Sequence, residues 1–209
     1  MRIIGAVALA HLINDLIQAV LPSIYPMLKA KYDLTFTQIG LITLTFQMTA
    51  SLLQPWVGYY TDRHPNPLLL PAGMVCTLIG ILMLSQVGSF PLILLAAALV
   101  GIGSSTFHPE ASRVARLASG GRYGLAQSTF QVGGNAGSAF GPLLAAAIII
   151  PFGQGNVAWF GLFALFAVGL LYVISRWYRN HLNLFKLKAG QKATHGLSKQ
   201  RVLGALVVL

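Results

Sequence analysis

The sequence has few charged residues and very few acids. Charged residues make up 9% of its 209 residues, and 4 Asp or Glu stand against 14 Lys or Arg, a formal net charge of +10. A soluble domain carries about 25% charged residues, so this chain has too few to cover a globular surface. At 56% hydrophobic residues it is also too apolar for a disordered protein. The composition excludes a typical soluble enzyme and indicates a membrane protein.

The chain has a single cysteine, Cys76, which lies within an apolar run. One thiol cannot form an internal disulfide bond, and no cysteine or histidine spacing typical of a metal site is present. No Ser/His/Asp set or phosphate-binding loop occurs with useful spacing either. We therefore expect no metal, no cofactor and no enzymatic activity.

Six stretches are long and apolar enough to cross a bilayer, which takes about 20 residues. They cover residues 3–28, 36–60, 68–88, 92–115, 125–150 and 157–177. We expect an all-α membrane domain over residues 1–178, a basic cytoplasmic linker over 179–201 and the start of a truncated seventh helix over 202–209, since those last residues reach only about 12 Å. The apolar stretch before Ala8 is too short for a cleaved signal peptide.

The basic residues predict the orientation. Half of them lie between Arg176 and Arg201, beside long apolar runs, which favours a cytoplasmic segment over a nucleic-acid interface. Arg63 and Arg122 lie in connections on the same side, whereas the connections after the third and fifth spans have no Lys or Arg. We expect both termini in the cytoplasm, although Lys29 and Lys31 run against the rule.

Polar side chains in the first span predict a functional face. His11, Asp15 and Gln18 share one face of a helix, and Asn14 lies beside them. Asp15 falls near the middle of the span, where a carboxylate must face a partner or water and can change its protonation state. We expect Asp15 and His11 to handle protons and Asn14 and Gln18 to contact substrate. The alternative is a structural pair of Asp15 with His11.

The end of the fourth span holds a second polar group. His108, Pro109 and Glu110 are followed by Arg113. Pro109 predicts a kink or break, and interrupted helices at membrane depth line cavities. We expect Glu110 and His108 to handle protons and Arg113 to bind an anion through its guanidinium group. The alternative is a Glu110–Arg113 ion pair that locks the helix end.

The fifth span has two different faces. One face carries a polar stripe of Gln127, Gln131 and Asn135. The other face carries a series of small residues, Gly133, Gly137 and Gly141. Small residues four apart let helices approach closely. We expect the glycine face, with Pro142, to pack on another helix and Gln131 and Asn135 to contact substrate.

The six spans divide into two units of three. The first and fourth spans each carry histidine and a carboxylate, and the second and fifth carry glutamines. This pattern is typical of a three-plus-three inverted repeat, in which the first helix of each unit lines a central pathway.

Two motifs resemble those of the major facilitator superfamily. The segment from Gly58 through Asp62 to Arg63 resembles the family signature between spans 2 and 3, without its later glycine and terminal basic residues. The segment from Gly137 to Pro142 resembles the antiporter motif in span 5 of proton-driven exporters, without two of its glycines. The resemblance implies the N-terminal half of this fold, with Gly58, Asp62 and Arg63 as a cytoplasmic gate.

Longer segments are similar to the bacterial fosmidomycin resistance transporters. These segments are residues 11–15, 34–40, 104–113 and 131–135. The resemblance covers almost the whole chain and implies a multi-pass exporter of the bacterial inner membrane. It implies export of a small anion such as a phosphonate, with the proton gradient as the energy source.

Two other functions stay open. The same fold serves proton-coupled symporters of organic anions, and a non-transporting membrane assembly half would need no substrate. The expected partners are the lipid bilayer, the small anionic substrate, and a missing C-terminal half or a second copy of the chain. Nucleic acid is not expected.

Overall fold

The computed structural model describes residues 1–191, with side chains as far as Leu182. This part of the chain is an all-helical bundle. The six predicted spans are confirmed as helical segments long and apolar enough to cross a membrane: Arg2–Ser23, Phe36–Arg63, Leu69–Gln86, Phe90–Leu117, Tyr123–Phe152 and Gln154–Leu182.

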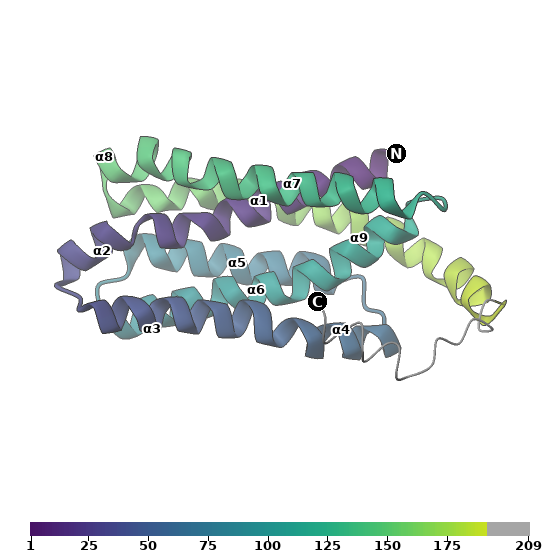
Figure 1. Ribbon diagram of the computed structural model, residues 1–209, viewed down its shortest axis with the longest axis horizontal. Coiled ribbons are helices and arrows are strands. Elements are labelled where there is room, and N and C mark those ends of the chain that lie inside the picture. Colours follow the sequence, from purple (N-terminus) through teal and green to yellow (C-terminus); the bar gives the residue numbers. More distant parts are fainter. Residues whose placement is uncertain (192–209) are drawn as a thin grey trace.

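The first, third and fourth spans are each a single α-helix, and the other three each combine two or three helical elements. In chain order the elements are α1 (Arg2–Ser23), α2 (Tyr25–Tyr32), α3 (Phe36–Gln47), η1 (Met48–Leu52), α4 (Leu53–Arg63), α5 (Leu69–Gln86), α6 (Phe90–Leu117), α7 (Tyr123–Leu144), η2 (Ala145–Ile149), α8 (Ile150–Phe152), η3 (Gln154–Ala158) and α9 (Trp159–Gln191). The spans alternate in direction, so the N-terminus, the end of α4 and the start of α7 lie at one end of the bundle, and α2 and α8 lie at the other (Figure 1).

The first span ends earlier than the apolar pattern predicts. α1 stops at Ser23 rather than near Leu28, and α2 begins at Tyr25 with Pro26 at its second position. Proline has no backbone N–H to continue the ladder but fits the first turn of a new helix. α2 ends at Tyr32, and Asp33, whose backbone is left-handed with φ of 48°, caps it.

The last described helix runs past the predicted membrane domain. α9 continues to Gln191, so the first part of the predicted linker is helical. Residues 192–209, which include the predicted start of a seventh helix, lie outside the described residues.

The packing of the spans follows the two predicted units of three. α1 packs chiefly on α7, and α6 packs on α3, η1 and α4. The first span of each unit therefore contacts the second span of the other unit. α5 and α9, the third spans, also contact each other. This reciprocal arrangement is what an inverted repeat predicts.

The sequence predicts a kink or a break at Pro109, and the structure shows that there is no break. α6 runs without interruption from Phe90 to Leu117, with Pro109 inside it. The hydroxyl groups of Ser105 and Thr106 donate to backbone carbonyls one turn earlier, and α4 packs beside the proline ring, with Pro109 Cβ 3.8 Å from the place of a Gly58 Cβ. α6 thus accommodates Pro109 without a break while α4 packs beside it, as other membrane helices with proline do.

A buried glutamine ties three connections together at the α2 end of the bundle. Gln154 Nε2 donates to the carbonyl oxygens of Leu84 at 2.8 Å and Val87 at 3.2 Å. Its Oε1 accepts from Lys31 Nζ at 2.8 Å and from the Tyr32 hydroxyl at 2.7 Å. Because each polar atom of the amide has a partner, this contact stabilises the end of the bundle.

Candidate functional site

The small-residue face of α7 lies directly against α1. A Cβ atom on Gly133 or Gly137 would overlap backbone carbonyl oxygens of α1, and one on Gly141 would lie 2.6 Å from another. The absence of side chains therefore lets the two backbones touch. Pro142, which follows this series, is exposed.

Gly134 makes room for two polar side chains of α1. A Cβ at this position would lie 2.6 Å from Nε2 of His11 and 2.8 Å from Oδ2 of Asp15. Any larger residue would displace one of them. The glycine repeat at every fourth residue does not include Gly134, so the sequence pattern did not predict its role.

Asp15 lies at the centre of a polar cluster between α1 and α6. Its Oδ1 accepts hydrogen bonds from Asn14 Nδ2 at 3.0 Å and Gln18 Nε2 at 3.2 Å. Its Oδ2 lies 3.3 Å from His11 Nε2, and its Oδ1 lies 3.3 Å from His108 Nε2. We call these five residues the Asp15 cluster. The contact with His108 joins the first spans of the two repeat units.

Backbone carbonyl groups hold both imidazole rings of the cluster. His11 Nδ1 lies 2.8 Å from the Phe130 carbonyl oxygen, and its ring stacks on the Phe130 ring. His108 Nδ1 lies 3.0 Å from the Ser104 carbonyl oxygen. A carbonyl oxygen can only accept, so each Nδ1 carries a hydrogen and each Nε2 faces Asp15. A lone pair on His108 Nε2 would repel the carboxylate oxygen beside it, so the contact between His108 Nε2 and Asp15 Oδ1 requires a proton. His11 Nε2 is buried and has no hydrogen-bond partner among the described residues.

Ser104 extends the cluster along α6. Its hydroxyl donates to Gln18 Oε1 at 2.9 Å and lies 3.2 Å from His108 Nδ1. Ser104 is therefore a residue of the site that the sequence analysis did not select. Its only signal was its position four residues before His108, on the same helix face.

A cavity of about 220 Å³ reaches the Asp15 cluster. Asp15, Gln18 and His108 line it, together with Phe46 of α3. The side chains of Asp15 and His108 are 17% and 25% exposed, whereas that of His11 is 2% exposed. Two of the three ionisable groups therefore reach the cavity, and His11 is enclosed behind them.

A second charged cluster lies nearer the end of α6. Arg113 NH1 donates to Glu110 Oε1 at 2.5 Å, and its NH2 donates to Asp62 Oδ1 at 2.5 Å. NH1 also donates to the Thr61 carbonyl oxygen at 3.2 Å. Glu110 is fully buried, whereas Asp62 is 71% exposed. We call Asp62, Glu110 and Arg113 the Arg113 cluster, and it links the end of α4 to α6.

The structure therefore separates residues that the sequence analysis grouped together. His108 contacts Asp15, and its near neighbour Glu110 contacts Arg113. The ion pair of Glu110 with Arg113 was the structural alternative for these two residues, and the geometry favours it. The guanidinium group already has two carboxylate partners, so it does not reach the Asp15 cluster.

The other predicted site residues lie around these two clusters. Gln131 and Asn135 are exposed on α7 and hydrogen bond to each other at 3.2 Å. Gly58 lies on α4 opposite Pro109. The Arg63 guanidinium lies over the Tyr59 ring, 3.7 Å from its centroid, so Arg63 does not join the Arg113 cluster.

The spacing within the Asp15 cluster also meets the distance requirement of a cation site. One ligand atom each from His11, Asp15 and His108 lies within 4.8 Å of the others. The linear sequence gave no sign of this, because the two histidines lie on different spans. The two amide donors that already occupy Asp15 Oδ1 favour a hydrogen-bonded cluster over a metal site.

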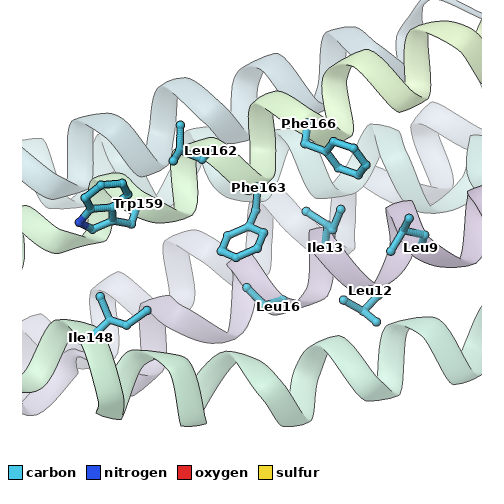
Figure 2. A pocket seen from close by; sticks show the side chains of 9 residues that line it. All are labelled: Leu9, Leu12, Ile13, Leu16, Ile148, Trp159, Leu162, Phe163 and Phe166. Carbon is cyan, nitrogen blue, oxygen red and sulfur yellow. The ribbon is translucent and has the colours of Figure 1, made fainter.

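A larger cavity of about 780 Å³ lies between α1, η2 and α9 (Figure 2). Its side chains are all apolar: Leu9, Leu12, Ile13, Leu16, Ile148, Trp159, Leu162, Phe163 and Phe166. The drawn side chains of α1 and α9 face each other across it (Figure 2). No charged group lines this cavity, so it does not provide the anion site that the sequence predicts.

Comparison with known proteins places the chain in a family. The sequence profile of the Major Facilitator Superfamily matches residues 7–208. The chain is 58% identical to the fosmidomycin resistance protein of Escherichia coli (strain K12) over 207 residues, which are 99% of the chain and 51% of that protein. It is 43% identical to the uncharacterized MFS-type transporter YfnC of Bacillus subtilis (strain 168) over 205 residues, which are 97% of the chain and 50% of that protein.

The chain thus spans about half the length of the curated relatives it matches. The matching half of the Escherichia coli protein is the N-terminal one. The family match covers nearly all of the six-span bundle, including both clusters. The chain belongs to the Major Facilitator Superfamily.

Proposed function

We propose that the chain forms one half of a proton-coupled exporter of small anionic compounds, working by alternating access. The observation that carries this proposal is the Asp15 cluster, in which a carboxylate within the first span meets two histidines beside a cavity. Ionisable groups at membrane depth are costly and mark proton or substrate pathways.

Proton binding in the cluster is connected to helix position. The contact between His108 Nε2 and Asp15 Oδ1 requires a proton, and His108 lies on α6 whereas Asp15 lies on α1. Loss of the proton between them leaves a repulsive contact across the interface of these two spans. Protonation of Asp15 and His108 therefore biases the α1–α6 interface, which is the type of two-state element that coupling needs.

The Arg113 cluster serves as a gate at the end of the bundle. Through Asp62, Arg113 holds the end of α4 against α6, and Glu110 fixes the guanidinium from the buried side. Most of the basic residues lie at this end, so we assign it to the cytoplasm. Glu110, which was predicted to carry protons, thus acts by holding the gate.

The substrate is a small anion such as fosmidomycin. The relative with 58% identity is a fosmidomycin resistance protein. Gln18 lines the cavity, and its amide can turn to a substrate there when its hydrogen bond to Asp15 is released. Asn14 is buried behind it and also donates to Asp15. Gln131 and Asn135 are exposed on α7, and Arg113 becomes available to an anion only when its contact with Asp62 opens.

Transport requires a second half or a second copy of the chain. The curated relatives are about twice as long, and the second and fifth spans are the least buried of the six. Exposed polar groups such as Gln131 and Asn135 need a partner surface at membrane depth. The antiporter-like segment from Gly137 to Pro142 favours export over symport.

The test uses the chain fused to the C-terminal half of the Escherichia coli relative, reconstituted in liposomes. We expect an imposed pH gradient to drive accumulation of labelled fosmidomycin, and Asp15→Asn to abolish this dependence on the gradient. Asp33→Asn is the matched control, because asparagine tolerates the left-handed backbone at that cap. Gradient-driven transport at the parental rate in Asp15→Asn would refute the assignment.

A further inference from the structure

Two arginines near the end of the sixth span have no acidic partner. Arg176 and Arg179 are spaced i, i+3, are both exposed, and form no ion pair within the described residues. The chain has only four acids, and none is available. Asp15 lies in its own cluster, Asp62 and Glu110 bind Arg113, and Asp33 caps α2 at the opposite end of the bundle. An anion that pairs with these arginines must therefore come from outside the chain.

The two arginines line a cavity of about 330 Å³. Tyr172 and Ser175 line it on the α9 side, and Asn66 and Leu68 line it from the connection between α4 and α5. The cavity is thus formed by two elements far apart in the sequence. The cavity lies at the end of the bundle where α4 ends, and α9 extends past the other helices at this end (Figure 1).

The N-terminus of α5 adds positive potential to the same cavity. α5 is 18 residues long, begins next to Leu68 and has no acid in its first turn. The aligned peptide dipoles of a helix give its N-terminus a partial positive charge. Asn66 accepts from the backbone N–H groups of Leu68 and Leu69, so this N-terminus contributes its dipole and the two guanidinium groups supply the donors that suit a phosphate group.

Apolar and aromatic side chains flank the charged groups. Leu68 is 53% exposed and Tyr172 is 51% exposed. Trp177, the residue after Arg176, stacks on His181 one turn further along α9. Tyrosine and tryptophan are enriched at the level of lipid headgroups. A free phosphate ion would gain nothing from Leu68 and Tyr172, whereas the glycerol and first methylenes of a lipid would pack on them.

We propose that this cavity binds the phosphate of an anionic phospholipid, held by Arg176 and Arg179. The lipid would connect α9 to the α4–α5 connection, which follows directly on the Arg113 cluster. A bound lipid would therefore contact the segment next to the proposed gate without touching Asp15 or its partners. The proposal stands on the charge and shape of this cavity and does not depend on the proposed transport activity.

The test is lipid binding to the purified 209-residue chain in a neutral detergent, measured by native mass spectrometry. Phosphatidylglycerol is the anionic probe, and phosphatidylcholine and inorganic phosphate are the comparisons. The variant is Arg176→Gln/Arg179→Gln. The control is Arg116→Gln/Arg122→Gln, which removes the same charge from the same end of the bundle at residues that do not line the cavity.

We expect the Arg176→Gln/Arg179→Gln variant to bind phosphatidylglycerol about thirtyfold more weakly, because the lost hydrogen bonds to phosphate contribute about 1 kcal/mol per arginine. The control should change binding by less than about threefold, because its arginines lie outside the cavity and solvent ions screen their charge. Equal losses in both variants would show diffuse attraction and overturn the proposal. Full competition by millimolar inorganic phosphate would overturn the assignment to a lipid.

A charge-preserving variant separates binding from folding. Arg176→Lys/Arg179→Lys keeps both positive charges, but an ammonium group cannot make the two-point contact of a guanidinium with phosphate. We expect it to bind phosphatidylglycerol several-fold more weakly than the parent while melting at the same temperature. Parental binding by this variant would contradict a direct contact between the arginines and the phosphate.

Discussion

Replacing Arg113 with glutamine would leave Glu110 buried without a cation beside it. Glu110 has no exposed surface, and its Oε1 lies 2.5 Å from Arg113 NH1. Its other carboxylate oxygen has no hydrogen-bond partner among the described residues. Glu110 thus depends on the guanidinium for its charge partner, so we expect Arg113→Gln to destabilise the bundle strongly.

Two arguments bound the loss in the free energy of unfolding that Arg113→Gln causes. Removing one partner of a buried ion pair costs about 3–5 kcal/mol. The carboxyl group can instead take up a proton, which from an ordinary pKa of about 4.3 costs about 3.7 kcal/mol at pH 7. We therefore expect a loss of about 3–4 kcal/mol in the free energy of unfolding at pH 7.

The same reasoning gives a pH dependence with a definite sign. When the folded variant holds a proton on Glu110 that the unfolded chain has released, the unfolded state binds fewer protons, so stability falls as the pH rises. The loss should shrink by about 1.4 kcal/mol for each pH unit between pH 7 and pH 5. The parent, with its ion pair intact, should change much less over this range.

Unfolding in detergent micelles, followed by circular dichroism, measures these differences. The double variant Glu110→Gln/Arg113→Gln removes both charges and should recover about 2 kcal/mol relative to Arg113→Gln. Asp62→Asn is the control, because its carboxylate is 71% exposed and an exposed pair contributes less than about 1 kcal/mol. A loss below about 1 kcal/mol in Arg113→Gln, or no recovery in the double variant, would refute the reasoning.

Three further predictions concern packing, the opposite end of the bundle, and metal. Gly137→Ala should cost about 1–3 kcal/mol because its Cβ meets the α1 backbone, whereas Gly124→Ala in the same helix, with open space around it, should be neutral or stabilising in the same unfolding assay. Gln154→Leu should cost about 1–3 kcal/mol, because it leaves the carbonyl oxygen of buried Leu84 without its partner, and Gln86→Leu is the comparison; equal losses would contradict the role of Gln154. Chelation with EDTA should leave gradient-driven transport by the fused protein unchanged, and a loss that zinc restores would assign the Asp15 cluster to a metal.

The sequence predicts the membrane class and the spans well because bilayer thickness imposes a simple rule. About 20 apolar residues are needed to cross it, and each predicted stretch contains a helix of that kind. The predicted end of the first span was wrong: the sequence places it near Leu28, and α1 ends at Ser23. Apolar residues continue to Leu28, but the helix restarts at Tyr25, and only Pro26 marked that position.

The partners of the polar residues could not be read from the sequence. Spacing placed His11, Asp15 and Gln18 on one face, and the structure unites them in one cluster. Spacing also grouped His108 with Glu110, because they are close in the chain, yet His108 contacts Asp15 of α1 whereas Glu110 pairs with Arg113 on its own helix. Which span lies opposite a residue depends on the packing of the whole bundle, and no local pattern contains that information.

Residues without a repeating pattern were missed altogether. Gly134 makes room for the Asp15 cluster, but it stands outside the glycine series that drew attention to α7. Gln154 joins three connections from a short helical turn, and a single glutamine in a loop gives no periodic signal. Both roles follow from close contacts between elements distant in the chain.

The most direct test of the central claim is a count of protons exchanged for substrate. In liposomes containing the fused protein and an interior pH indicator, addition of fosmidomycin to the cytoplasmic side should move protons in the opposite direction. The Asp15→Asn variant should bind substrate but move no protons with it. Proton exchange that is unchanged in Asp15→Asn would contradict the assignment of proton coupling to the Asp15 cluster.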